Sequence, residues 1–212
     1  MLKKKSDVPK AMLSFVRDLP TRHKVKVKKM RCDNTGENKK TEELFKSHGM
    51  GIEFKYTAAG TPQQNGKVER KIATIIGKLR ATLNSAGIRD KTREGIWGEG
   101  VTTITLLEAI LTNGSRKGPY ELFFGKLPKY ARHLKTFGEI GVTAKLNRKM
   151  SGKLQDKGNV SMMVGYAENH AGDVYRMLSL KTKKISLRRD ICCLKKSYGE
   201  YLNWKKKGSE DS

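Results

Sequence analysis

Hydrophobic positions follow a helical spacing in the first part of the chain. In residues 6–19 a Ser or Asp cap and a Pro in the first turn precede apolar residues that recur every three or four positions, so this stretch predicts a helix. In residues 24–33 valines alternate with lysines until the turn-forming run DNTGEN, which predicts a strand that ends at Asp33. Residues 41–47 and 52–56 predict a short helix and a short strand.

A long helix is predicted from residue 65 or 66 to about residue 86. Its apolar positions form one continuous stripe: Val68, Ile72, Ile75, Ile76, Leu79 and Leu83. The start stays open between two positions, because Thr61, Pro62 and Gln64 also make a plausible capping box. A further helix is predicted over residues 96–111.

After about residue 130 the pattern changes to short strands separated by turns. The four segments are EIGVTA, NVSMMVGY, DVYRMLSL and KKISLRRDICCL, and together they favour a small antiparallel barrel. We therefore expect an α/β core over residues 1–128 and a separate all-β barrel over residues 133–195. Residues 196–212 are basic and polar, and we expect them to be a disordered tail.

The net charge of the chain indicates which class of molecule it binds. The chain has 45 Lys and Arg residues against 21 Asp and Glu, a net charge of +24, which favours a polyanion such as nucleic acid over a merely solvated surface. No apolar run is long enough for a transmembrane helix, so no membrane partner is expected. The three cysteines form no C-x-x-C pair, which argues against a zinc site. The basic N-terminus has no apolar segment after it, so we expect the nucleus or cytoplasm.

Two acidic residues, Asp33 and Glu69, occupy positions from which their side chains could come close together. Asp33 ends a predicted strand, and Glu69 lies beside the apolar stripe of the long helix, so the intervening elements could bring both carboxylates to one edge of a sheet. Carboxylates so placed can share Mg²⁺ ions and support phosphoryl transfer. The alternative is that Asp33 is a turn residue and Glu69 a helix N-terminal acid favoured by the helix dipole.

Several sequence segments, taken together, favour the catalytic interpretation of Asp33 and Glu69 over the purely structural one. They occur in one order along nearly the whole chain: RCDNTGEN at 31–38, GTPQQNGKVERK at 60–71, GIWGEG at 95–100, PYELFFGKLP at 119–128, LKTFGE at 134–139, VGY at 164–166 and YRMLSLKTKKISLRRDI at 175–191. This set resembles the integrase region of a copia-type retrotransposon polyprotein. The resemblance implies a truncated ribonuclease H-like core of the retroviral integrase type, followed by an SH3-like barrel.

The same resemblance implies an activity and its residues. In that family two Asp and one Glu bind two Mg²⁺ ions, with Mn²⁺ as a substitute, and join a DNA 3′-hydroxyl to target DNA. Asp33 matches the second Asp and Glu69 matches the Glu, so both are the implied catalytic and metal-binding residues. The loop before Glu69 matches a flap over the active site.

The chain also departs from the family pattern. The first acid belongs on an earlier strand, but the aspartates before Asp33, Asp7 and Asp18, lie at the ends of a predicted helix. DNTGEN has Thr35 where a Gly is more usual and Asn38 where an aromatic is. We therefore expect weak or absent Mg²⁺ binding and an inactive, DNA-binding remnant. The open alternatives are an active integrase, a non-catalytic nucleic-acid-binding module and a fragment of a larger active polyprotein.

The resemblance also implies DNA contacts around Glu69. On the non-apolar face of its helix, five residues would grip phosphates without reading sequence: Lys67, Arg70, Lys71, Thr74 and Lys78. Three residues of the preceding loop could hydrogen-bond DNA ends: Gln63, Gln64 and Asn65. The alternatives are a solvated helix face and a polar loop. Trp97, Tyr166 and Tyr175 are expected in the core, and a homo-oligomer is left open.

Overall fold

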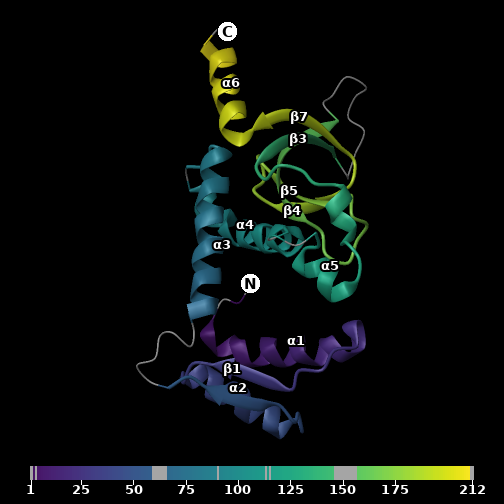
Figure 1. Ribbon diagram of the computed structural model, residues 1–212. Coiled ribbons are helices and arrows are strands. Elements are labelled where there is room, and N and C mark those ends of the chain that lie inside the picture. Colours follow the sequence, from purple (N-terminus) through teal and green to yellow (C-terminus); the bar gives the residue numbers. More distant parts are fainter. Residues whose placement is uncertain are drawn as a thin grey trace. The chain divides into compact units, whose positions relative to one another are not determined.

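The chain divides into two compact units. The computed structural model describes residues 2, 4–58, 66–89, 91–112, 114, 116–145 and 157–210, with the side chains of the last two left out. The two units are Met1–Ala73 and Thr74–Ser212 (Figure 1). The sequence instead predicted a division near residue 130, and the packing of the second unit explains the difference.

The first unit is built on a parallel pair of short strands, β1 (Lys29–Cys32) and β2 (Glu53–Tyr56). The connection between them is α2 (Gly36–Ser47), and the unit also contains η1 (Lys5–Asp7) and α1 (Val8–His23). Its buried core consists of Leu13 and Val16 of α1 with Phe45 of α2. A strand, a helix and a parallel strand form the expected βαβ connection, because parallel neighbours need a crossover.

The strand and helix bounds of this unit differ from the predicted ones. α1 continues through Pro20, and β1 is shorter than the alternation of valines and lysines suggests, because β2 offers only four partners. α2 begins at Gly36, five residues before the predicted start. The DNTGEN run is therefore partly the first turn of a helix rather than only a loop.

The long predicted helix is present as α3 (Gly66–Ser85), and α4 (Thr92–Ile110) follows it. Only the C-terminal half of the α3 stripe is buried. Leu79 and Leu83 are 5% and 2% exposed, whereas Val68 and Ile72 are 61% and 56% exposed. The apolar spacing therefore predicted the helix but not how much of its face is covered.

The second unit contains a five-stranded antiparallel sheet in the order β6-β5-β4-β3-β7. The strands are β3 (Glu139–Ala144), β4 (Gly158–Tyr166), β5 (Tyr175–Ser179), β6 (Ile185–Arg188) and β7 (Ile191–Ser197). Two short helices precede the sheet, α5 (Pro119–Phe124) and η3 (Lys129–Arg132). Within the described residues no ladder joins β6 to β7, so the sheet is open where the sequence predicted a closed barrel.

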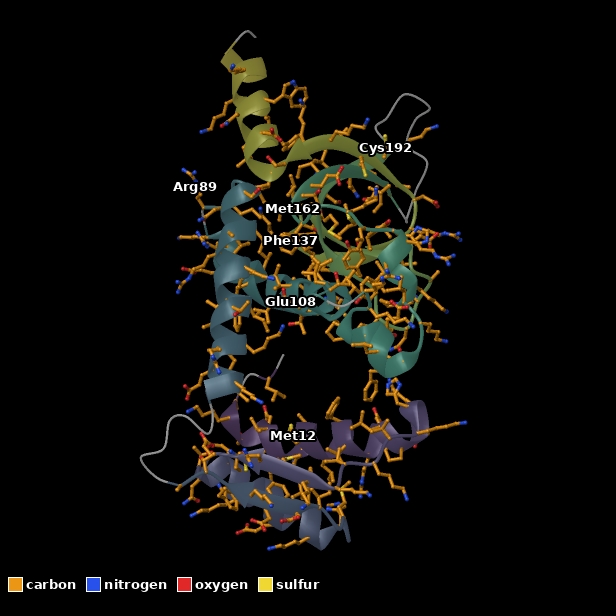
Figure 2. All side chains as sticks on the ribbon, in the orientation of Figure 1. Met12, Arg89, Glu108, Phe137, Met162 and Cys192 are labelled. Atoms are coloured by element: carbon orange, nitrogen blue, oxygen red, sulfur yellow. The ribbon has the colours of Figure 1, made fainter. Side chains whose placement is uncertain are left out.

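The helices α3 and α4 share one core with this sheet. Leu83 and Ile96 belong to the same buried cluster as Ile140 and Met162, and Figure 2 labels Met162 and its neighbour Phe137 there. Gly100 permits the close approach of the helices, because a Cβ there would lie 2.4 Å from Leu79 Cδ1.

Polar contacts fasten α4 to the sheet as well. Thr103 Oγ1 donates to the Val164 carbonyl at 3.1 Å, and Arg176 donates two hydrogen bonds of 2.7 Å to Glu99. A bidentate Arg–carboxylate pair fixes orientation as well as position. Together with the shared apolar core, these contacts explain why the division falls before α4 rather than after it.

Aromatic burial was predicted in part. Tyr166 and Tyr175 are 3% and 5% exposed, which confirms their place in the core. Trp97 is 48% exposed, so its prediction as a core residue is wrong. It lies on α4 one residue after the buried Ile96, which places it about 100° further around the helix. In the part of the chain that the structure describes, no helix has the length and apolar character to cross a membrane.

The C-terminal segment that was expected to be a disordered tail includes a helix, α6 (Tyr198–Glu210). Tyr198 is 4% exposed, and the Gly199 amide donates to the Ala86 carbonyl at 3.0 Å. Gly199 also lies against Gly87, where the backbones approach so closely that a Cβ on Gly199 would be 2.9 Å from Gly87 Cα. These contacts anchor the start of α6, which the polar composition of the segment could not reveal.

Replacing Gly199 by Ala should therefore lower the free energy of unfolding by about 1–3 kcal/mol, because the added Cβ meets backbone that cannot rotate away. Gly208→Ala in the same helix is the matched control, since its Cβ would meet nothing within 4 Å. The control should be neutral or stabilising by up to about 1 kcal/mol, because Ala favours helix over Gly. Chemical denaturation of both variants measures the difference, and equal stabilities would contradict this account of the Gly87 contact.

Candidate acidic site and nucleic-acid interface

Asp33 directly follows the last residue of β1 and organises the start of α2. Its Oδ1 accepts a hydrogen bond of 2.9 Å from Thr35 Oγ1 and one of 2.6 Å from Asn38 Nδ2. Asn38 Nδ2 also lies 3.2 Å from the Asp33 carbonyl. A side chain that bonds groups two and five residues ahead is typical of turns and helix starts. The two residues that depart from the family pattern, Thr35 and Asn38, are thus the donors to Asp33.

Glu42, another acid near β1, also has hydrogen-bond and ion-pair partners. Glu42 of α2 accepts a hydrogen bond of 2.6 Å from Tyr56 Oη and forms an ion pair of 2.8 Å with Lys46. The hydrogen bonds from Lys46 and then Tyr56 lower the pKa of Glu42. Burial, followed by the bond to Glu42, raises the pKa of Tyr56. Glu42 therefore ties α2 to β2, a role that the sequence analysis did not identify.

The charges of Asp33 and Glu42 also affect the pKa of the Cys32 thiol. Burial is the main cause that raises the pKa of Cys32, and the charges of Asp33 and Glu42 raise it further. Since the thiolate is the nucleophile and metal ligand, a raised pKa makes this cysteine less reactive.

Glu69 lies in the first turn of α3 and is exposed. This position suits the alternative of a helix N-terminal acid, which the helix dipole favours. The loop residues Gln63, Gln64 and Asn65 lie outside the described residues. The predicted meeting of Asp33 and Glu69 stays a prediction.

The described donor set does not complete a two-metal centre. In the ranges that the structure describes, no group of three or more His, Cys, Asp and Glu side chains is arranged to hold a metal ion. One carboxylate oxygen of Asp33 already accepts two hydrogen bonds. Carboxylates that bind metals are themselves commonly hydrogen-bonded, so these two bonds restrict the orientation of Asp33 without removing its second oxygen as a ligand.

The residues predicted to grip phosphates lie on one face of α3. An α-helix has about 3.6 residues per turn, so these five positions fall within an arc of about 100°. By the same geometry Glu69 lies about 200° around the helix from Lys67, almost opposite the middle of this arc. The basic face and Glu69 therefore point in different directions, and the family role of each can be tested separately.

The five side chains differ in their present partners. All five are exposed, but Arg70 Nε donates to the Gly66 carbonyl at 3.1 Å. Lys78 forms an ion pair with Glu108 of α4, which is labelled in Figure 2 and is only 11% exposed. Lys78 would have to leave a largely buried carboxylate to bind a phosphate. Lys67 and Lys71, about one helical turn apart and both exposed, are the two lysines to test on this face.

Comparisons with known proteins place the chain in a wider context. No protein-family model matches it. The chain is 34% identical over 174 residues to the "Retrovirus-related Pol polyprotein from transposon TNT 1-94" of Nicotiana tabacum. The match covers 78% of this chain and 12% of that polyprotein, so the chain spans only a small part of its relative.

A solved structure gives a weaker likeness. A chain of the "CryoEM structure of simian T-cell lymphotropic virus intasome in complex with PP2A regulatory subunit B56 gamma" aligns with a TM-score of 0.43 and 13% identity. The alignment covers 90% of this chain and 66% of the other, but a TM-score this low carries no argument about the fold. The sequence match is informative, because it shows that the chain is related to the Pol polyproteins of copia-type retrotransposons. It confirms the resemblance of the chain's motifs to the integrase region of those polyproteins.

Proposed function

We propose that this chain is an integrase-related protein that binds DNA largely independently of sequence and does not itself join DNA ends. The observation that carries the proposal is the 34% identity over 174 residues to a retrotransposon Pol polyprotein. The net charge of +24 supports it, because a polyanion is the partner that such a charge attracts.

The fold we propose follows the same relationship. The β1–α2–β2 unit with its parallel strands suits part of a ribonuclease H-like core. The five antiparallel strands suit an SH3-like domain, although the described sheet is open. In this proposal the DNA partner lies against the basic face of α3, and its phosphates are neutralised by Lys67, Arg70 and Lys71.

The proposed lack of catalysis rests on the acids. Asp33 and Glu69 match two of the three family acids, and among the described residues no group of three metal-ligating side chains includes them. We expect Mg²⁺ or Mn²⁺ to bind weakly at most. A second candidate is an active integrase formed within a longer polyprotein, which the 12% coverage of the relative favours.

The binding face can be tested by removing two charges from α3. Lys67→Ala with Lys71→Ala should weaken binding to a duplex at 100 mM salt by about 10- to 100-fold and lower the salt slope by about 2. The matched control is Lys26→Ala with Lys28→Ala, two exposed lysines of the same compact unit. Fluorescence anisotropy with a labelled duplex measures both.

Equal losses in the two double variants would mean that net charge alone attracts DNA, and the α3 face would then be the wrong interface. An unmutated chain that binds no duplex at 50 mM salt would contradict the proposed function itself. The two outcomes are thus distinguishable in one titration series.

A further inference from the structure

A groove of about 510 Å³ lies on the second unit, and its lining includes none of the residues that the proposed function uses. It is bounded by the end of β3, the start of β4, the turn between β5 and β6, and α6. Four lysines and two tyrosines contribute to its lining: Lys145, Lys181, Lys183, Lys205, Tyr198 and Tyr201. Among the residues that the structure describes, no Asp or Glu lines it. Cations from three separate segments therefore converge on one hollow.

Three of the four lysines are available to a ligand. Lys181, Lys183 and Lys205 are exposed, and no ion pair joins any of them to a residue that the structure describes. Like charges gathered in a groove repel one another and focus a positive potential there. An anionic ligand with several charges would relieve this repulsion.

The β5–β6 turn holds two of the lysines in fixed positions. The Lys183 amide donates to the Ser179 carbonyl at 2.9 Å, and the Ser179 amide donates to the Lys184 carbonyl at 3.0 Å. Thr182 N donates to Ser179 Oγ at 3.2 Å. Lys183 has a φ of 55°, a left-handed conformation that this network maintains. A turn with this many internal bonds has little backbone freedom left to lose when its lysines bind a ligand.

The opposite wall is one face of α6. Tyr198, Tyr201 and Lys205 recur at helical spacing, and Tyr198 is buried while its helix is anchored through Gly199. Trp204 lies beside Tyr201, with ring centroids 5.9 Å apart, and is 59% exposed. Trp204 is not itself a lining residue, but together with Tyr201, which is, it offers exposed flat aromatic surface.

This combination distinguishes between polyanions. Lysines alone would suit any phosphate chain, but base stacking on aromatic side chains requires bases that are not already stacked in a duplex. A positively charged groove with aromatic side chains is the arrangement by which proteins bind single strands without reading their sequence. We propose that this groove binds single-stranded nucleic acid, with the lysines on phosphates and a base stacked on Trp204. The site is separate from the α3 face and goes beyond the proposed function.

The test uses the full chain with Trp97→Phe, which leaves Trp204 as the one tryptophan of the two in the sequence. The probes are a 12-nucleotide thymidine oligomer, an abasic oligomer of the same length and charge, and a 12-base-pair duplex. The thymidine oligomer should quench Trp204 fluorescence and bind about tenfold more tightly than the abasic one, because stacking contributes where a base is present. Trp204→Ala should abolish this difference in affinity, measured by anisotropy, and Trp204→Phe should restore part of it.

The lysines are tested in the same assay. Lys181→Gln with Lys183→Asn should weaken single-strand binding about tenfold or more, and Asn is chosen because it tolerates the left-handed conformation. The control is Lys126→Gln with Lys129→Asn, which removes two exposed lysines of the same unit that do not line the groove. The control should bind like the parent.

Two results would overturn the inference. One is equal affinity for thymidine and abasic oligomers, which would leave only phosphate attraction. The other is unchanged single-strand binding in the groove variant. If duplex binding still depended on Lys67 and Lys71 in either case, the proposed function would stand and only the groove would fail.

Discussion

The affinity of the purified chain for duplex DNA should fall about 10³-fold between 50 and 200 mM salt. This expectation assumes about six phosphate contacts, each of which releases condensed counterions when a Lys or Arg neutralises it. The large excess of Lys and Arg over Asp and Glu supplies the cations. Filter binding or anisotropy over a salt series gives the slope of log affinity against log salt directly.

The same series separates electrostatic from sequence-dependent binding. Two duplexes of unrelated sequence should give the same affinity and slope, because phosphate contacts carry no sequence information. Glu69→Gln should leave affinity unchanged or raise it slightly, since it removes a negative charge from α3. A slope corresponding to fewer than about two contacts, or a strong preference between the duplexes, would contradict this account.

The periodic elements of this chain could be predicted because a period needs only local information. The stripe of α3 and the short strand-like segments separated by turns are visible in the sequence, and the helix and the strands β3 to β5 are present in the structure. The last predicted strand is divided into β6 and β7, with Arg189 and Asp190 between them. Breaks of this kind depend on the local backbone rather than on apolar spacing.

The unpredicted features depend on particular partners. α2 begins early because Asp33, Thr35 and Asn38 bond to one another at its start. The division between units falls before α4 because its buried face packs on β4, and a helical stripe does not name its partner. α6 is a helix in a polar segment because its first turn is anchored through Gly199.

The candidate site was predicted only as a set of residue types. The sequence predicts that Asp33 follows a strand and that Glu69 opens a helix, and both placements are found. It could not show that Thr35 and Asn38 occupy an oxygen of Asp33, nor that Lys78 pairs with Glu108, because each is a contact between side chains. Helical geometry alone could have shown that Glu69 lies away from the basic face.

Strand-transfer assays with pre-processed DNA ends and Mg²⁺ or Mn²⁺ should give no product above that of the Glu69→Gln protein. Two cations brought close to a phosphodiester need several carboxylates to offset their repulsion and to fix their geometry. Of the described residues, no three metal-ligating side chains are arranged in this way. The hydrogen bonds from Thr35 and Asn38 further restrict how Asp33 could bind a cation.

DNA binding can be measured separately from strand transfer, so a lack of product can be distinguished from a lack of bound DNA. DNA binding on α3 should survive Glu69→Gln, so the parent and the variant can be compared at equal DNA occupancy in the same buffer. The double variant Thr35→Gly with Asn38→Phe, which restores the more usual family residues, would free Oδ1 of Asp33 but add no acid, so it too should give no product. Clear product from the parent that disappears in Glu69→Gln would overturn the proposed inactivity. It would mean that another carboxylate, from this chain or from a partner chain, completes the acidic set around Asp33 and Glu69.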